Sequence, residues 1–75
     1  MNGAKVAQLR RAKGWSQQQL AVAAGVHVMT VSAAERGAKE PTFATAEALA
    51  RALEVPLAQL LADPAPAPAG AERAS

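Results

Sequence analysis

The chain has 75 residues, which allows one small domain; hydrophobic residues make up 51%, but much of this is alanine, and a thin all-α core is expected. It contains no cysteine, which excludes disulfides and thiolate metal sites, and its net charge of +2 permits nucleic-acid binding without indicating it. No apolar run approaches the roughly 20 residues of a membrane span, and the N-terminus lacks a signal-peptide core. We therefore expect a soluble, cytoplasmic protein with no membrane partner.

The first predicted helix runs from about Gly3 to Lys13 and is followed by a glycine, Gly14, that ends it. Val6 and Leu9 form its buried stripe. Its exposed faces carry the basic residues Lys5, Arg11 and Lys13. Arg10 lies beside this stripe, too close to the core for a free charge.

The second predicted helix is short and has a well-marked start. Ser16 and Gln19 have the spacing of a capping box, and Trp15 and Leu20 have that of a hydrophobic staple. The helix is predicted to end at Gly25, because glycine adopts positive φ without a Cβ clash.

The third predicted helix follows after a tight turn and runs from about Val28 to Arg36, where Gly37 closes it. Ala21 is expected to face this helix at the closest approach of the two axes, and Val31 to pack into the angle between them. These features fit a helix-turn-helix, whose second helix projects and can enter a DNA groove. They also fit a plain αα-hairpin inside a helical bundle, so the spacing alone leaves both interpretations open.

Two further helices are predicted after a loop. Pro41 disfavours helix just before it, and Thr42 is a suitable N-cap for a helix that ends at about Leu53. Its predicted inner face consists of Phe43, Ala46, Leu49, Ala50 and Leu53. A short fifth helix is expected from Pro56 to Leu61 or Ala62. The folded domain is thus predicted over residues 1–62. Residues 63–75 contain an alternating Pro-Ala run, and we expect them to be a disordered tail or the start of a linker.

The run from Leu9 to Thr42 resembles the Cro/C1-type (XRE-like) helix-turn-helix family of phage repressors and small bacterial regulators. The matching residues are Leu9-Arg10, Lys13-Gly14, Ser16-Gln17, Leu20-Ala21, Gly25-Val26, Val31-Ser32, Glu35-Arg36-Gly37, Pro41, Leu49 and Leu53. The resemblance spans about Val6 to Leu61 and implies a compact five-helix, lambda-repressor-like DNA-binding domain. It also implies an ion pair between Arg10 and Glu35; the alternative is two solvated charges.

The function implied by the resemblance is sequence-specific binding of double-stranded DNA by a transcriptional regulator, most often a repressor, that acts as a homodimer on a palindromic operator. Gln17 would then contact phosphate at the start of the second helix, where backbone N–H groups are also free. The other candidates for phosphate contacts are Arg11, Lys13, Arg36, Lys39, Thr42 and Phe43. The dimer interface is expected at Leu57, Leu60 and Leu61, for which simple core packing is the alternative.

Base contacts would come from the outward face of the third helix. The candidates are His27, Val28, Met29, Thr30, Ser32 and Ala33. Val28, Met29 and Ala33 depart from the family, which usually has polar side chains at these positions, and none of them can form the bidentate bonds that discriminate guanine or adenine. Apolar groups can still contact thymine methyls. An exposed apolar face also fits a second hypothesis, a protein-interaction module of antitoxin or adaptor type.

The sequence gives no support to catalysis. The only histidine is His27, at a helix cap, with no cysteine, second histidine or acidic cluster near it in sequence. Such a histidine serves far more often as a cap or phosphate donor than as a metal ligand. We expect neither an enzyme nor a cofactor or metal site.

Overall fold

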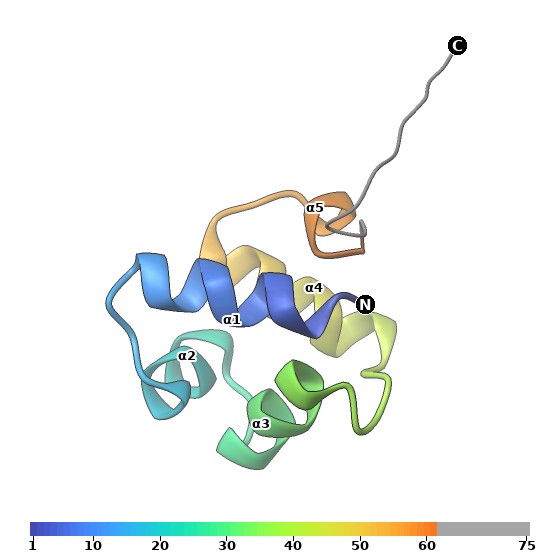
Figure 1. Cartoon of the computed structure of the whole chain (residues 1–75), viewed down its shortest axis with the longest axis horizontal. Coiled ribbons are helices and arrows are strands. Elements are labelled where there is room, and N and C mark those ends of the chain that lie inside the picture. Colours follow the sequence, from blue (N-terminus) through green and yellow to red (C-terminus); the bar gives the residue numbers. More distant parts are fainter. Residues whose placement is uncertain (62–75) are drawn as a thin grey trace, which may run out of the picture.

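The structure is a computed structural model that describes residues 1–61, and these residues form helices only. The elements are α1 (Gly3–Ala12), α2 (Gln17–Ala24), α3 (Val28–Arg36), α4 (Phe43–Leu53) and α5 (Leu57–Leu61). In Figure 1, α1 crosses the middle of the molecule, with α5 on one side and α2 and α3 on the other. The predicted all-α class and the order of the five helices are confirmed. Ala62 and the predicted tail, residues 63–75, lie outside the described residues.

Polar side chains cap the N-termini of the first four helices, where backbone N–H groups have no partner within the helix. Asn2, Ser16, His27 and Thr42 each accept a hydrogen bond from an N–H of the first turn. Each such cap is worth about 1 kcal/mol. The capping box of α2 is complete, since Ser16 N–H also donates to Gln19 Oε1 over 2.8 Å.

The turn between α2 and α3 depends on a glycine in the left-handed region. Gly25 caps α2 with a φ of 72°, and Gly37 ends α3 in the same way with a φ of 69°. Because the chain reverses within residues 25–27, α3 leaves α2 at once and packs across it. The expected helix-turn-helix geometry is therefore present.

The core lies between these helices and is built from leucine, valine and alanine. Its buried members are Val6, Leu20, Ala21, Val31, Ala34, Leu49, Ala50, Leu53 and Leu60. Trp15 and Leu9 pack against this cluster while partly exposed. The alanines have no bulk beyond Cβ, so α2, α3 and α4 can approach closely. No helix of residues 1–61 combines the length and apolar character needed to cross a membrane.

Gly3 marks the closest approach of α1 to α3. A Cβ added at this glycine would lie under 3.0 Å from the carbonyl oxygens of Ala34 and Glu35. Those oxygens belong to the backbone of α3 and cannot turn aside as a side chain can. The N-terminus of α1 thus rests directly on the last turn of α3.

The burial of side chains in α4 and α5 corrects one prediction and decides another. Phe43 was expected on the inner face of α4 but is 69% exposed. It is the first residue of the helix, and its side chain points back toward the N-terminus, beyond the end of the core. For Leu60 a dimer surface and simple core packing were both open, and its side chain is fully buried in the protomer's own core. Of the three leucines of α5, Leu57 is partly buried against the same core, and only Leu61 is mainly exposed.

Candidate nucleic-acid interface

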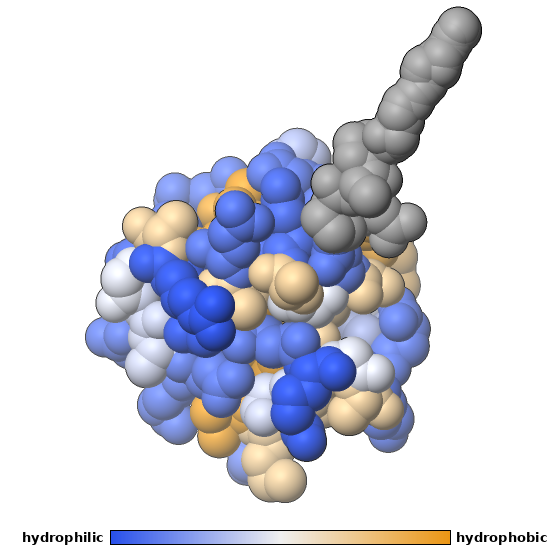
Figure 2. All heavy atoms as spheres, viewed as in Figure 1, coloured by the Kyte–Doolittle hydropathy of each residue, from blue (hydrophilic) through white to orange (hydrophobic). Residues whose placement is uncertain are grey.

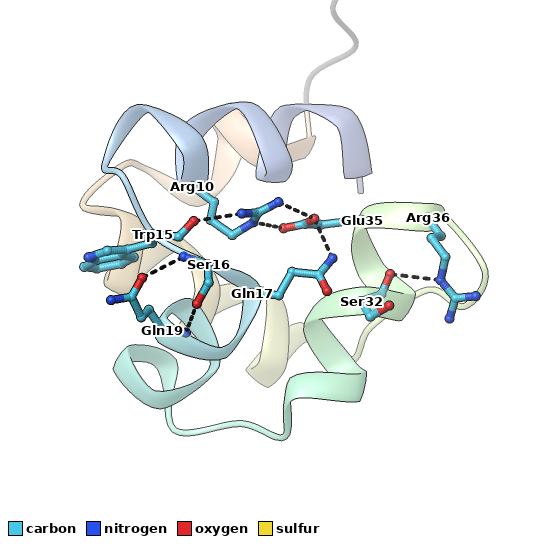
Figure 3. A network of polar contacts seen from close by, with 8 residues as sticks. All are labelled: Arg10, Trp15, Ser16, Gln17, Gln19, Ser32, Glu35 and Arg36. Atoms are coloured by element: carbon cyan, nitrogen blue, oxygen red, sulfur yellow. Dashed lines mark hydrogen bonds and ion pairs between the residues drawn. The ribbon is translucent and has the colours of Figure 1, made fainter.

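A buried ion pair joins α1 to α3. Arg10 Nε donates to Glu35 Oε2 over 2.6 Å, and its Nη2 donates to Oε1 over 3.2 Å. The third donor, Nη1, bonds the backbone carbonyl of Trp15 over 2.8 Å. The two side chains are 11% and 6% exposed. The structure therefore contains the pair implied by the resemblance, and Figure 3 shows both side chains lying between the helices.

Gln17, the first residue of α2, belongs to the same network. Its Nε2 donates to Glu35 Oε1 over 3.0 Å (Figure 3). An amide nitrogen carries two hydrogens, so one N–H and the amide oxygen stay available for another partner. The carboxylate thus holds the amide in place beside the last turn of α3. Sequence spacing gave no signal of this bond, because the two residues lie in different helices.

The outward face of α3 is narrower than predicted. Met29 is 71% exposed, and Ala33 lies one turn further on the same side. Ser32 and Arg36 form the adjacent row, where Arg36 Nε donates to the Ser32 carbonyl oxygen over 3.3 Å. Val28, by contrast, is half-buried and packs against the core, so it is not part of the outward face.

A shallow cavity of about 450 Å³ runs along this face, between α3 and the loop that leads to α4. Its lining residues are Met29, Thr30, Ala33, Lys39, Glu40, Pro41, Thr42 and Thr45. The α3 side supplies Met29 and Ala33, and the loop and the first turn of α4 supply most of the polar groups. Thr45 was not predicted to lie here; its position one turn after the N-cap Thr42 is the only sequence signal for it.

His27 is exposed and caps α3 through its ring. Its Nδ1 accepts from the Met29 N–H over 3.1 Å, which leaves Nε2 for another partner. The structure therefore gives this histidine the capping role expected for it. In the part of the chain that the structure describes, no group of three or more His, Cys, Asp or Glu side chains gathers where it could hold a metal ion.

Among residues 1–61 every glutamate has an ion-pair partner, whereas several basic side chains have none. Each glutamate in this range has a cationic partner, with Glu35 on Arg10, Glu40 on the α-amino group of Met1, Glu47 on Arg51 and Glu54 on Lys13. The basic side chains without an ion-pair partner among the described residues are Lys5, Arg11, Arg36 and Lys39. Neutralised carboxylates and free cations together leave a surface suited to a polyanion.

Lys13 differs from its predicted position on an exposed face. It lies just after α1, its side chain is 28% exposed, and its Nζ is 3.2 Å from Glu54 Oε1. The same Nζ lies 5.1 Å from the centre of the Trp15 ring. Lys13 is thus engaged within the domain, whereas Lys39 is exposed beside the cavity.

The surface seen in Figure 2 has no continuous apolar patch. Hydrophobic residues appear there as small separate areas among hydrophilic ones. The large hydrophobic side chains that are well exposed are Val22, Met29, Phe43 and Leu61, and they come from four different helices. Because Val28 packs against the core, only Met29 and Ala33 remain of the apolar face of α3 that could bind a protein partner.

Several known helix-turn-helix regulators are similar to most of this chain. The HTH-type transcriptional regulator SutR of Escherichia coli K12 is 39% identical over 57 residues, and the match covers 76% of this chain but only 32% of SutR. The chain therefore spans about a third of that relative. The controller protein C.AhdI of Aeromonas hydrophila, from a restriction-modification system, superposes with a TM-score of 0.75 at 34% identity, covering 77% of this chain and 88% of C.AhdI.

Two structures of the master biofilm regulator SinR are also similar. SinR in complex with DNA gives a TM-score of 0.78 at 33% identity and covers 83% of this chain and 100% of the SinR chain. The N-terminal DNA-binding domain of SinR from Bacillus subtilis gives 0.74 at 32% identity, covering 85% and 94% of the two chains. A family model described as Helix-turn-helix matches residues 6–60. With this match and the geometry above, the chain belongs to the Cro/C1-type (XRE-like) helix-turn-helix family.

Proposed function

We propose that this domain is a sequence-specific, DNA-binding transcriptional regulator that places α3 in the major groove. The observation that carries the proposal is the exposed face of α3, flanked by free cations and fixed in position by the buried Arg10–Glu35 pair. Contacts to bases choose the sequence, and contacts to phosphates hold the protein in register. The similarity to SinR, whose chain was solved with DNA, supports the same mode of binding.

The phosphate contacts are proposed on both sides of α3. Gln17 stands on one side, with the free N–H of its amide, and Lys39 stands on the other, at the edge of the cavity. The backbone N–H groups at the start of α4, at Thr42 and Phe43, lie next to Lys39 in the chain. Arg36 and Arg11 are exposed cations that add long-range attraction.

A homodimer on a palindromic operator is part of the proposal, with half-sites about one helical turn apart. Leu61 is the leucine of α5 that remains mainly exposed for such a contact. Repression follows where the operator overlaps a promoter, because the bound dimer then blocks the polymerase. We place this activity in the cytoplasm and assign the domain no catalytic role.

The test is fluorescence anisotropy with a random duplex pool, before and after rounds of selection, repeated over a range of salt concentrations. Selection should enrich a palindrome that binds about a thousandfold more tightly than the pool. The logarithm of the affinity should fall linearly with the logarithm of the salt concentration. Binding that stays weak and unselected at low salt would contradict the proposal, and the search would then turn to a protein that covers Met29.

A further inference from the structure

The geometry of α3 points to readout of pyrimidine 5-methyl groups. We propose that Met29 and Ala33 form an apolar reader that recognises the methyl group of thymine, or of 5-methylcytosine, on the floor of the major groove. This inference rests on the proposed function and specifies how the same surface chooses its sequence.

The two side chains have the position and the chemistry for this contact. Met29 lies on the outward face of α3 and is 71% exposed. Ala33 is one turn away, so the two line the same side of the helix and both border the cavity. Among the standard bases only thymine presents a methyl group in the major groove. A flexible thioether adapts its shape to such a group.

The polar side chains near this reader lie at its edges or carry only a hydroxyl group. His27 uses Nδ1 to cap α3, and Arg36 uses Nε to bond the Ser32 carbonyl at the far end of the helix. Thr30 is half-buried at the side of the cavity. The centre of the outward face therefore carries no amide or guanidinium group for a bidentate bond to guanine or adenine. The side chains at this centre can therefore discriminate bases through apolar contact.

The cavity beside the reader combines a cation, which suits the phosphates of a DNA strand, with an apolar wall, which suits its base methyl groups. Its α3 wall carries Met29 and Ala33, and its opposite wall carries the cation of Lys39. The one carboxylate in the lining, Glu40, is paired with the α-amino group of Met1. A strand that sets its phosphates against Lys39 can turn the base edges of the same nucleotides toward the apolar wall.

The experiment replaces thymine by uracil, one position at a time, in the duplex obtained by selection. Uracil keeps every hydrogen-bonding group of thymine and lacks only the methyl group. At one or two positions of each half-site, uracil should weaken binding by about fourfold, the loss expected for one methyl group removed from an apolar contact. At the same positions 5-methylcytosine paired with guanine should bind more tightly than unmethylated cytosine.

Protein variants link this effect to α3. Met29→Ala should bring the ratio of thymine to uracil affinities close to one at the sensitive positions, and Met29→Leu should keep most of it. Val22→Ala is the matched control, because Val22 is also 71% exposed but lies on α2, and it should leave the ratio unchanged.

The outcomes separate the inference from the proposed function. If a selected palindrome is bound tightly and uracil is tolerated at every position, methyl readout is wrong and the regulator function stands. A thymine preference that survives Met29→Ala would likewise overturn the assignment to this side chain. If selection enriches no sequence, both the function and the readout are rejected.

Discussion

Gln17 and Glu35 are joined by a hydrogen bond, with the amide Nε2 3.0 Å from an oxygen of the carboxylate that Arg10 also holds. One buried carboxylate therefore connects the first residue of α2, the last turn of α3 and, through Arg10, the last turn of α1. The arrangement fixes the angle between α2 and α3, and it also fixes the amide that we propose as a phosphate contact. Glu35 therefore stabilises the domain and also positions the amide of the proposed phosphate contact.

Removing this carboxylate should destabilise the domain strongly. Glu35→Ala leaves the Arg10 guanidinium buried and without its anion, which costs about 3–5 kcal/mol of unfolding free energy. Urea denaturation followed by circular dichroism measures the loss. Glu47→Ala is the control, since the Glu47 side chain is 51% exposed and lies 3.9 Å from Arg51, and it should cost well under 1 kcal/mol.

The paired replacement of Arg10 by Met and Glu35 by Leu should recover most of that loss, because it removes both buried charges together. A Glu35→Ala variant no less stable than Glu47→Ala would show that the ion pair contributes nothing. A double variant as unstable as Glu35→Ala would show that the loss comes from packing rather than from the uncompensated charge.

Gly3→Ala should destabilise the domain although alanine is the better helix former. Its Cβ would overlap the carbonyl oxygens of Ala34 and Glu35, so α1 would have to move away from α3. The expected cost is about 1–3 kcal/mol, despite a gain of roughly 1 kcal/mol in helix propensity. Gln8→Ala, at an exposed position of the same helix, should be neutral or slightly stabilising in the same thermal melts. A Gly3→Ala variant with a raised Tm would contradict the close approach.

The fold was predictable because its signals are local. Capping residues, glycines at helix ends and the spacing of apolar residues all act within a few positions, and they placed the five helices to within about a residue of their bounds. The Arg10–Glu35 pair came from the family resemblance, since no local pattern joins residues in α1 and α3. The same limit explains why the bond from Gln17 to Glu35 was not foreseen.

The errors concern which side chains a helix turns outward. Phe43 was placed on the inner face by hydrophobicity, yet it is exposed at the start of α4; the sequence left Leu60 open between a dimer surface and the core, and it is fully buried. Val28 and Lys13 were expected on exposed faces. In the structure Val28 packs against the core, and Lys13 contacts Glu54 and the Trp15 ring. The exposure of each of these side chains depends on residues that are distant in sequence. The cavity beside α3 likewise forms between residues of α3, the loop and α4.

The leucines of α5 should separate dimerisation from folding. Leu61→Ala removes an exposed side chain, so it should weaken self-association and change the unfolding free energy by less than about 0.5 kcal/mol. Leu60→Ala empties part of the core and should cost about 2–5 kcal/mol. Sedimentation equilibrium and urea denaturation measure the two effects. If Leu61→Ala self-associates as wild type does, the dimer contact lies elsewhere.

Two lysines should differ in their share of the salt dependence of DNA binding. Lys39 is exposed beside the cavity and has no ion-pair partner among the described residues, so Lys39→Ala should lower the slope of log affinity against log salt by about 0.9, the value for one phosphate. Lys13 is held by Glu54 and lies over Trp15, so Lys13→Ala should change the slope much less. Anisotropy titrations of both variants on the same duplex make the comparison. A larger change for Lys13→Ala than for Lys39→Ala would mean that DNA draws Lys13 out of its pair, and that the phosphates follow α1 rather than the loop before α4.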